Sequence, residues 1–502
     1  MNKMLHPENF EWYNDEDKSL KDKIEEVYDT MAVILQHLNC HADAEKLYAS
    51  SVLSKERHEA KLRKLFEGRK ELDGRKGELL FDKNKTDFVF LTVLLSFLDE
   101  KAYQLRKRRW ETDIFSFDDM ICTDGLNSAR SQKQTQLAIL PRYSCIWEGH
   151  SRESNHVLDM NIYLEYSYFV ELDGGKINGQ YKIRNHILDP GIYGVCPDIQ
   201  RELFVTAGLS PISKNIVLDV QTYEEKTAEY ESNYFTVEPL NSKSVKDVKQ
   251  ILKKVLQDAD QDEVDFLVFP EMLGTESMIR ELASELEKAP LRNIKFFVAP
   301  SVWEKEEKHN NTNTSYVINY EGNLLFGQDK LKPFPMKWDK NIYMEDIKRC
   351  DTIHIIHCSG YGSIAVPICR SELDEVVKDI LVRRLNVKLL LCPSWSTGSY
   401  EFETSIMSGA ERCCNTVWCN TCSALTDKKA DEKVIGIITG YGKNKIFSDN
   451  SFSKRRSPVK EWKEDEKGRG CSNCREKGCY YVKRIYGTDF SEDELEEGVE
   501  DK

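Results

Sequence analysis

The sequence predicts an α/β protein in which a mainly helical N-terminal region precedes a domain of alternating strands and helices. Two observations carry this prediction. From about residue 231 onward, short apolar runs alternate with amphipathic segments, a pattern typical of a sheet covered by helices on at least one face. Residues 1–140 instead carry apolar side chains at helical spacing, with charges on the opposite face.

Length and composition limit the functional classes. A chain of 502 residues is long for one domain, so we expect two or more. Its net charge of −14 argues against a general attraction to nucleic acid or to an anionic membrane. The longest apolar run, residues 88–98, is too short to span a bilayer, and no export signal precedes it. An odd number of cysteines, 15, favours free thiols in a reducing compartment, so we expect a cytoplasmic protein.

The N-terminal region, residues 1–140, is expected to contain helices at about 20–38, 42–66 and 88–109. Residues 141–230 form a mixed connecting region. There, segments 164–172 and 180–184 flank Asp173, Gly174 and Gly175, which suggests a β-hairpin. A helix over the same residues is the alternative.

The domain from 231 to 487 contains the alternating pattern. We expect strands at 235–239, 264–270, 294–301, 314–320, 324–328, 352–357, 362–368, 387–392 and 416–424, and helices at 245–259, 276–288, 373–384 and 402–414. Residues 488–502 form an acidic tail that is expected to be disordered.

Cys471, Cys474 and Cys479 follow a C-x2-C-x4-C pattern near the end of this domain. A closed structural zinc site has four ligands. A zinc site would therefore need a fourth ligand from elsewhere, and free loop thiols are the alternative interpretation.

Cys369 stands at the turn from the apolar run 362–368 into the expected helix. A thiol at such a turn gains exposed approach as a nucleophile, and the first N–H groups of the helix can stabilise an anion there. A buried structural cysteine is the alternative, because free cysteine is among the most buried residue types. Two further strand ends carry the complementary groups, a carboxylate at Glu271 and an ammonium at Lys330. Together they predict a site at the edge of a sheet.

Four blocks carry a family resemblance: FLVFPEMLG (266–274), NTSYVINYEGNLLFGQDKLKPF (313–334), GSIAVPICRSELDE (362–375) and SGAERCCNTVWCNT (408–421). In this order they resemble the signature blocks of the carbon-nitrogen hydrolase family, the nitrilase superfamily. The resemblance covers about residues 231–487 and implies a nitrilase-like αββα sandwich with a Glu-Lys-Cys triad and no cofactor.

The resemblance also implies a role for each site residue. Glu271 matches the base, Lys330 the lysine and Cys369 the nucleophile. Lys332 is a nearby alternative to Lys330, but Lys330 matches the motif better. Glu345 stands where many members have a second glutamate that orients the substrate and the lysine.

The chain departs from the family after the nucleophile, where Arg370, Ser371 and Glu372 follow Cys369. True nitrilases commonly have Trp-Glu at that point, so the departure argues against nitrile hydrolysis. If Arg370 faces the pocket, it would bind a carboxylate or a phosphate on the substrate. If it faces away, it pairs with surface acids.

The expected function is hydrolysis of a non-peptide, amide-type C–N bond through a cysteine thioester. One alternative is a nitrilase-like interaction or sensing module, for example in a bacterial defence system. Another is acyl transfer from the same thioester to an amine. The expected partners are a small amide-type substrate, further copies of the chain by analogy with the family, and a protein bound through residues 1–230.

Overall fold

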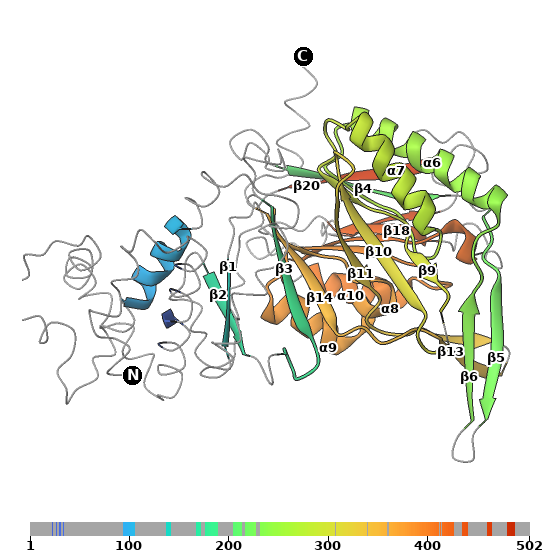
Figure 1. Ribbon diagram of the computed structural model, residues 1–502, viewed down its shortest axis with the longest axis horizontal. Helices are drawn as coiled ribbons and strands as arrows, with labels where there is room; N and C mark the ends of the chain where they lie inside the picture. Colours follow the sequence, from blue (N-terminus) through green and yellow to red (C-terminus); the bar gives the residue numbers. More distant parts are fainter. Residues whose placement is uncertain are drawn as a thin grey trace, which may run out of the picture. The chain divides into compact units, whose positions relative to one another are not determined.

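The computed structural model divides the chain into two compact units, residues 1–143 with 152–187, and residues 144–151 with 188–502; Figure 1 shows their elements. The structure describes residues 94–105, 137–141, 167–171, 176–188, 204–212, 216–226, 231–425 (without 307, 339, 359, 360, 411 and 413), 434–439, 459–463 and 479–486, with positions 23, 27, 30, 31 and 34. The statements below concern these residues.

The first unit contains a helical segment at 94–105, inside the helix expected at 88–109. Its buried residues recur at helical spacing: Leu94, Leu95, Leu98, Ala102 and Leu105. The other N-terminal helices expected from the sequence lie largely or wholly outside the described residues, as does the acidic tail at 488–502.

The hairpin expected around Gly174 and Gly175 does not form between its two predicted strands. Strand β2 (Ser167–Glu171) pairs antiparallel with β1 (Leu137–Pro141) instead. The tight turn lies further along, where an isolated bridge joins Ile177 to Tyr181 ahead of β3 (Lys182–Leu188). At its centre, Asn178 and Gly179 both have positive φ, 53° and 64°, which is the conformation that an Asn-Gly turn favours.

The second unit is built on two large sheets. One runs in the order β11-β10-β8-β7-β4-β20, with β9 beside β10. Its strands are β4 (Phe204–Ile212), β7 (Phe266–Val268), β8 (Phe296–Val298), β9 (Val302–Glu304), β10 (Thr312–Asn319), β11 (Leu324–Asp329) and β20 (Cys479–Tyr486). The other runs β19-β18-β17-β16-β15-β14. Its strands are β14 (Thr352–Cys358), β15 (Gly362–Ala365), β16 (Leu389–Pro393), β17 (Asn415–Cys419), β18 (Val434–Thr439) and β19 (Val459–Lys463).

The two sheets pack face to face through their central strands, with β17 and β18 against β4 and β17 and β16 against β7. They approach closely at Gly436 of β18, where a Cβ atom would overlap the buried side chain of Leu209 on β4. The thiol of Cys419 also lies 3.3 Å from the carbonyl oxygen of Ser210, across the same interface.

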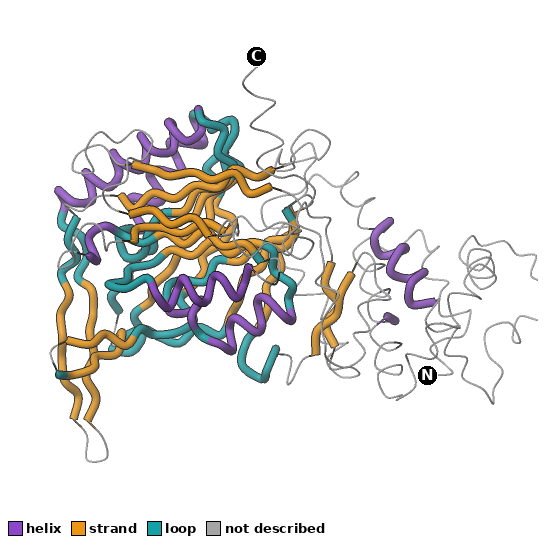
Figure 2. Tube along the Cα trace, turned by 180° about the vertical axis from the view of Figure 1, so that it is seen from behind, coloured by secondary structure: helices purple, strands orange, loops and turns teal. Residues whose placement is uncertain are grey.

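Helices cover the outer face of each sheet, as Figures 1 and 2 show. Helices α6 (Ser242–Gln261) and α7 (Glu276–Lys288) bury their apolar faces against the first sheet. Helix α10 (Tyr400–Ala410) packs Phe402 and Ile406 against Trp418 of the second sheet. The order of layers is helix, sheet, sheet, helix, and the predicted αββα sandwich is confirmed.

The sandwich begins earlier in the chain than the predicted boundary at 231. Strand β4 lies inside the sheet, parallel to β7 and antiparallel to β20. Its burial is nearly continuous along the sequence FVTAGLSPI. That segment contains a glycine, a serine and a proline and lacks the period of two that marks a half-buried strand, so the sequence did not reveal it.

The expected helix at 373–384 is broken into three short pieces: α8 (Arg370–Leu373), α9 (Glu375–Lys378) and a π-helical turn, Asp379–Arg384. The break lies at Asp374, whose backbone is extended (ψ 119°) and whose side chain accepts from the Val377 N–H. Asp374 therefore caps α9. A 3₁₀ turn, Cys422–Leu425, follows β17.

A small third sheet in the order β12-β13-β6-β5 joins β5 (Val220–Lys226), β6 (Glu231–Val237), β12 (Pro335–Trp338) and β13 (Asn341–Glu345). Figure 1 shows β5 and β6 extending beyond the sandwich. The sequence predicted one of these strands, at 235–239. Among the described residues, no helix combines the length and the hydrophobicity that crossing a membrane requires.

Candidate active site

The three predicted triad residues follow the ends of three strands. Glu271 comes three residues after β7, Lys330 comes directly after β11, and Cys369 lies between β15 and α8. Two backbone hydrogen bonds join the segments: the Glu271 N–H donates to Ser394 O, and the Cys369 N–H donates to Pro393 O. Pro393 is the last residue of β16, the strand beside β15, and Ser394 follows it directly.

Lys330 is the charged centre of the site. Its Nζ lies 2.6 Å from Glu271 Oε1 and 2.7 Å from Glu345 Oε2. Glu345, at the end of β13, is thus brought to the triad by the third sheet. All three side chains are buried, so the ammonium has the two carboxylates as its counterions in place of water.

Cys369 is held in an unusual backbone conformation, with φ 46° and ψ −111°. A positive φ is strained for a residue with a side chain, and such strain is concentrated at functional sites. Met272, directly after Glu271, also has a positive φ of 64°. Glu271 and Cys369 are therefore both presented by turns with a strained backbone.

The thiol of Cys369 is buried and interacts electrostatically with all three charged groups. Burial raises the pKa of Cys369 well above its usual range; the negative charge of Glu271 adds to this, and Lys330 opposes it. The resting thiol is therefore protonated at neutral pH and needs a base to react. Its Sγ lies 3.8 Å from Trp395 O, the acceptor toward which it donates.

Lys330 and Glu345 each affect the pKa of the other. Burial by itself lowers the pKa of Lys330, but the carboxylates of Glu271 and Glu345 more than reverse this and raise it. Lys330 therefore stays protonated. Burial raises the pKa of Glu345, while the Lys330 ammonium opposes the shift.

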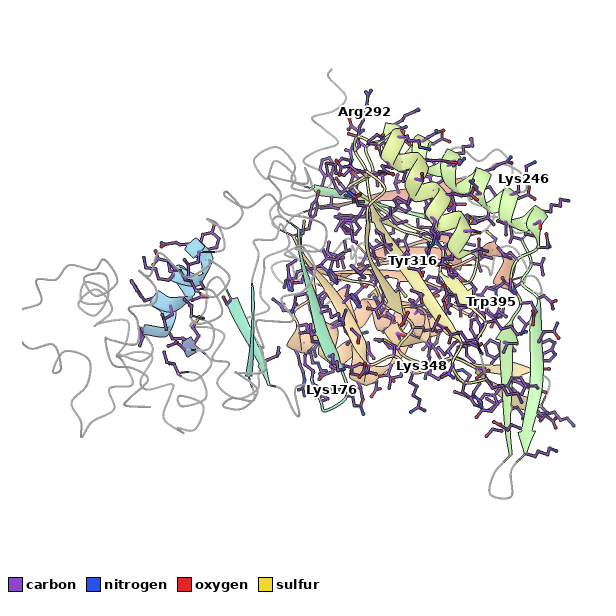
Figure 3. The ribbon with its side chains drawn as sticks, in the orientation of Figure 1. Lys176, Lys246, Arg292, Tyr316, Lys348 and Trp395 are labelled. Atoms are coloured by element: carbon purple, nitrogen blue, oxygen red, sulfur yellow. The ribbon has the colours of Figure 1, made fainter. Side chains whose placement is uncertain are left out.

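Backbone and amide donors complete the coordination of the carboxylates. The Trp395 N–H donates to Glu271 Oε2 at 2.9 Å, and the Phe334 N–H donates to Glu345 Oε2 at 2.8 Å. Asn313 donates its side-chain amide to both carboxylates. Figure 3 labels Trp395 on the side of the sandwich toward β6 and β13. Sequence reasoning missed these donors, although Asn313 is the first residue of the second signature block.

The remaining candidates lie outside this cluster. The Nζ of Lys332 pairs with Asp374 at 3.2 Å, and both side chains are partly exposed. Arg370 is 37% exposed and its Nη1 lies 3.6 Å from Glu401 Oε2 on α10, which corresponds to the surface-acid alternative. Cys479 is buried at the start of β20, whereas Cys471 and Cys474 lie outside the described residues. Within the described part of the chain, no cluster of His, Cys, Asp or Glu could hold a metal ion.

No protein-family model matches the sequence, and neither does any curated protein. Solved structures do match. An amidase from Nesterenkonia sp. is 12% identical, with a TM-score of 0.34, over 59% of this chain and 95% of that one. Saccharomyces cerevisiae Nit3, a member of branch 10 of the nitrilase superfamily, is 13% identical, with a TM-score of 0.36, over 59% and 95%. The C. elegans NitFhit protein is 16% identical, with a TM-score of 0.33, over 56% and 60%. Nit3 belongs to the superfamily that the four sequence blocks resemble. Because the identities and TM-scores are this low, the chemistry of this chain is argued below from its own residues.

Proposed function

We propose that the chain hydrolyses a non-peptide, amide-type C–N bond, with Cys369 as nucleophile, Glu271 as base and Lys330 as cation. The observation that carries this proposal is the buried ion-pair arrangement, in which Lys330 Nζ lies within 2.7 Å of both Glu271 and Glu345. Two buried carboxylates and an ammonium beside a buried thiol are costly to fold. Clusters of buried charged groups of this kind are typical of catalytic sites.

In the proposed first step, Glu271 takes the thiol proton while Cys369 Sγ forms a bond to the carbonyl carbon of the amide. Negative charge then develops on the carbonyl oxygen. Lys330 and the backbone N–H of Arg370, at the start of α8, would stabilise it. The C–N bond breaks as Glu271 gives its proton to the departing amine or ammonia, leaving a thioester on Cys369.

In the second step, Glu271 removes a proton from water, which attacks the thioester carbon. The C–S bond breaks, the carboxylic acid departs, and the proton returns to the thiol. Glu345 would hold Lys330 in place through both steps, since it is the second carboxylate on the same ammonium. An amine in place of water would give acyl transfer by the same route.

The test is to trap Cys369 with a panel of small amides and to locate the adduct by intact-mass and peptide mass spectrometry. We expect the unmodified chain to gain the mass of the acyl group less the thiol hydrogen that it replaces, and Cys369→Ala to gain none. Ammonia release should fall by ~10³-fold or more in that variant. Cys358→Ala is the matched control, because it removes an equally buried thiol from β14, the neighbouring strand.

Two outcomes would contradict the proposal. One is a Cys369→Ala variant that releases ammonia at the rate of the unmodified chain. The other is the absence of any adduct across the panel, which would favour the interaction or sensing module. Addition of an amine separates hydrolysis from acyl transfer, because acyl transfer gives a new amide as the product.

A further inference from the structure

Asn313 contacts both carboxylates of the site. It lies in β10, and its side chain is 1% exposed. Its Nδ2 donates to Glu271 Oε1 at 2.8 Å and to Glu345 Oε1 at 3.2 Å. A primary amide has two N–H donors, so this arrangement uses both of them.

The orientation of this amide follows from its neighbours. Ser301 Oγ accepts a hydrogen bond from the Met272 N–H at 2.7 Å. The hydroxyl hydrogen of Ser301 therefore remains to be donated, and Asn313 Oδ1 lies 2.6 Å away to accept it. With its oxygen bound to Ser301, Asn313 must present its NH₂ group to the carboxylates.

The same chain of hydrogen bonds supports the turn that carries the base. Met272 has a positive φ of 64° directly after Glu271. Its N–H is bound by Ser301, which also donates its own backbone N–H to Pro270 O. Asn313 further accepts the Lys330 N–H on its backbone oxygen, at 2.8 Å. One residue thus contacts the base, the second glutamate and the lysine.

We propose that Asn313, oriented by Ser301, is a positioning residue that holds the carboxylate of Glu271 in place to take the proton of Cys369; this inference rests on the proposed function. An amide donor stabilises a carboxylate only in the form that accepts hydrogen bonds, which is the ionised form. Removing the donor withdraws that stabilisation. The reactivity of Cys369, which needs an ionised base, should then be lost at a higher pH than in the unmodified chain.

The experiment measures the alkylation rate of Cys369 by iodoacetamide from pH 5 to pH 9, with the modified residue identified by peptide mapping. This readout needs no substrate. In Asn313→Ala, we expect the acid limb of the rate profile to move up by about one pH unit, since a hydrogen bond to a charged group is worth roughly that much. At pH values on that acid limb, the alkylation rate of Asn313→Ala should be about tenfold lower than that of the unmodified chain. Ser301→Ala should shift the limb in the same direction by less, because it frees the amide without removing it.

Asn319→Ala is the matched control. Asn319 is also a buried asparagine of β10, but its Oδ1 accepts the N–H groups of Glu321 and Asn323 at the opposite end of the strand. We expect this variant to lose stability without moving the acid limb. A purely structural role for Asn313 would make the two variants behave alike.

The outcomes separate this inference from the proposed function. If Cys369 of the unmodified chain reacts no faster than its other buried thiols at every pH, the proposed function fails. If Cys369 reacts but Asn313→Ala and Ser301→Ala both keep the original acid limb, only the positioning role fails. Should Asn313→Ala not fold, the milder Ser301→Ala decides alone.

Discussion

Lys330 Nζ lies 2.6 Å from Glu271 Oε1, and neither side chain is accessible to solvent beyond 1%. With Glu345 on the same ammonium, the buried cluster consists of two carboxylates and one cation. Removing the lysine would leave both carboxylates buried without a counterion, so we expect the stability of the sandwich to depend on it.

We expect Lys330→Met to lower the free energy of unfolding by about 3–5 kcal/mol, because it leaves two buried carboxylates without their counterion. Chemical denaturation at pH 7.5 measures this. Lys332→Met is the control: its pair with Asp374 is partly exposed, and such pairs contribute about 0–1 kcal/mol. Adding Glu345→Gln to Lys330→Met should restore part of the loss. An equal loss of unfolding free energy in Lys330→Met and Lys332→Met would show that Lys330 is not the buried counterion.

Glu372, on α8, predicts a pH dependence of stability. Burial raises its pKa to about 7, against the opposing charge of Lys378 and a hydrogen bond from Ser405. Cys392 of β16 is close enough to Glu372 to interact with it electrostatically. A carboxyl whose pKa is raised in the folded state stabilises that state below its unfolded pKa, and the benefit is lost as pH rises through the folded value.

Glu372→Gln removes this dependence. Relative to that of the unmodified chain, its free energy of unfolding should rise by about 2–3 kcal/mol from pH 5 to pH 8, because the pKa of Glu372 is shifted by about 2.5 units. Denaturant titrations at both pH values give the comparison. Glu375→Gln, an exposed carboxyl of α9, controls for the change in net charge. If the unfolding free energies of Glu372→Gln and the unmodified chain differ by the same amount at pH 5 and at pH 8, Glu372 is not the group that makes stability depend on pH.

The sequence predicted the elements whose signals are local. Helix α7 begins and ends where expected, at Glu276 and Lys288, because Thr275 caps it and its apolar face is regular. Glu271, Lys330 and Cys369 could be named because each follows a strand within a recognisable block. The structure brings Glu271 and Lys330 into direct contact, and it places Cys369 within electrostatic reach of both.

The features that were missed depend on contacts between distant segments. The strand at β4 has no period of its own and is defined by β7 and β20 on either side. The role of Asn313 depends on Ser301, Glu271 and Glu345, which three different segments supply. The break at Asp374 depends on a side-chain cap that competes with a continuous helix. Periodicity does not encode any of these relationships.

Gly436 tests the packing of the two sheets. A Cβ atom there would overlap the side chain of Leu209, which is fully buried on the facing sheet. We expect Gly436→Ala to cost about 1–3 kcal/mol of unfolding free energy, as overpacking of a core does. Gly398→Ala is the control, since nothing lies within 4 Å of its Cβ position. The double variant Gly436→Ala with Leu209→Val should lose less unfolding free energy than the two single variants lose together. If the two losses simply add, the added methyl group does not clash with Leu209.

Glu271 should be essential to the reactivity of Cys369 even without a substrate. Burial is the largest cause that raises the pKa of the Cys369 thiol, and it persists when Glu271 is replaced. Little thiolate therefore exists at neutral pH, and alkylation requires transfer of the proton to Glu271. We expect Glu271→Gln to slow iodoacetamide alkylation of Cys369 at pH 7 by ~10²-fold or more, in the range of general base catalysis. The deficit should shrink toward pH 10, where hydroxide can remove the proton. Peptide mapping distinguishes Cys369 from the other thiols, and Glu401→Gln, an exposed carboxyl of α10, should react like the unmodified chain. If Glu271→Gln reacts at the original rate at pH 7, the thiol ionises without this carboxylate and another base must be sought.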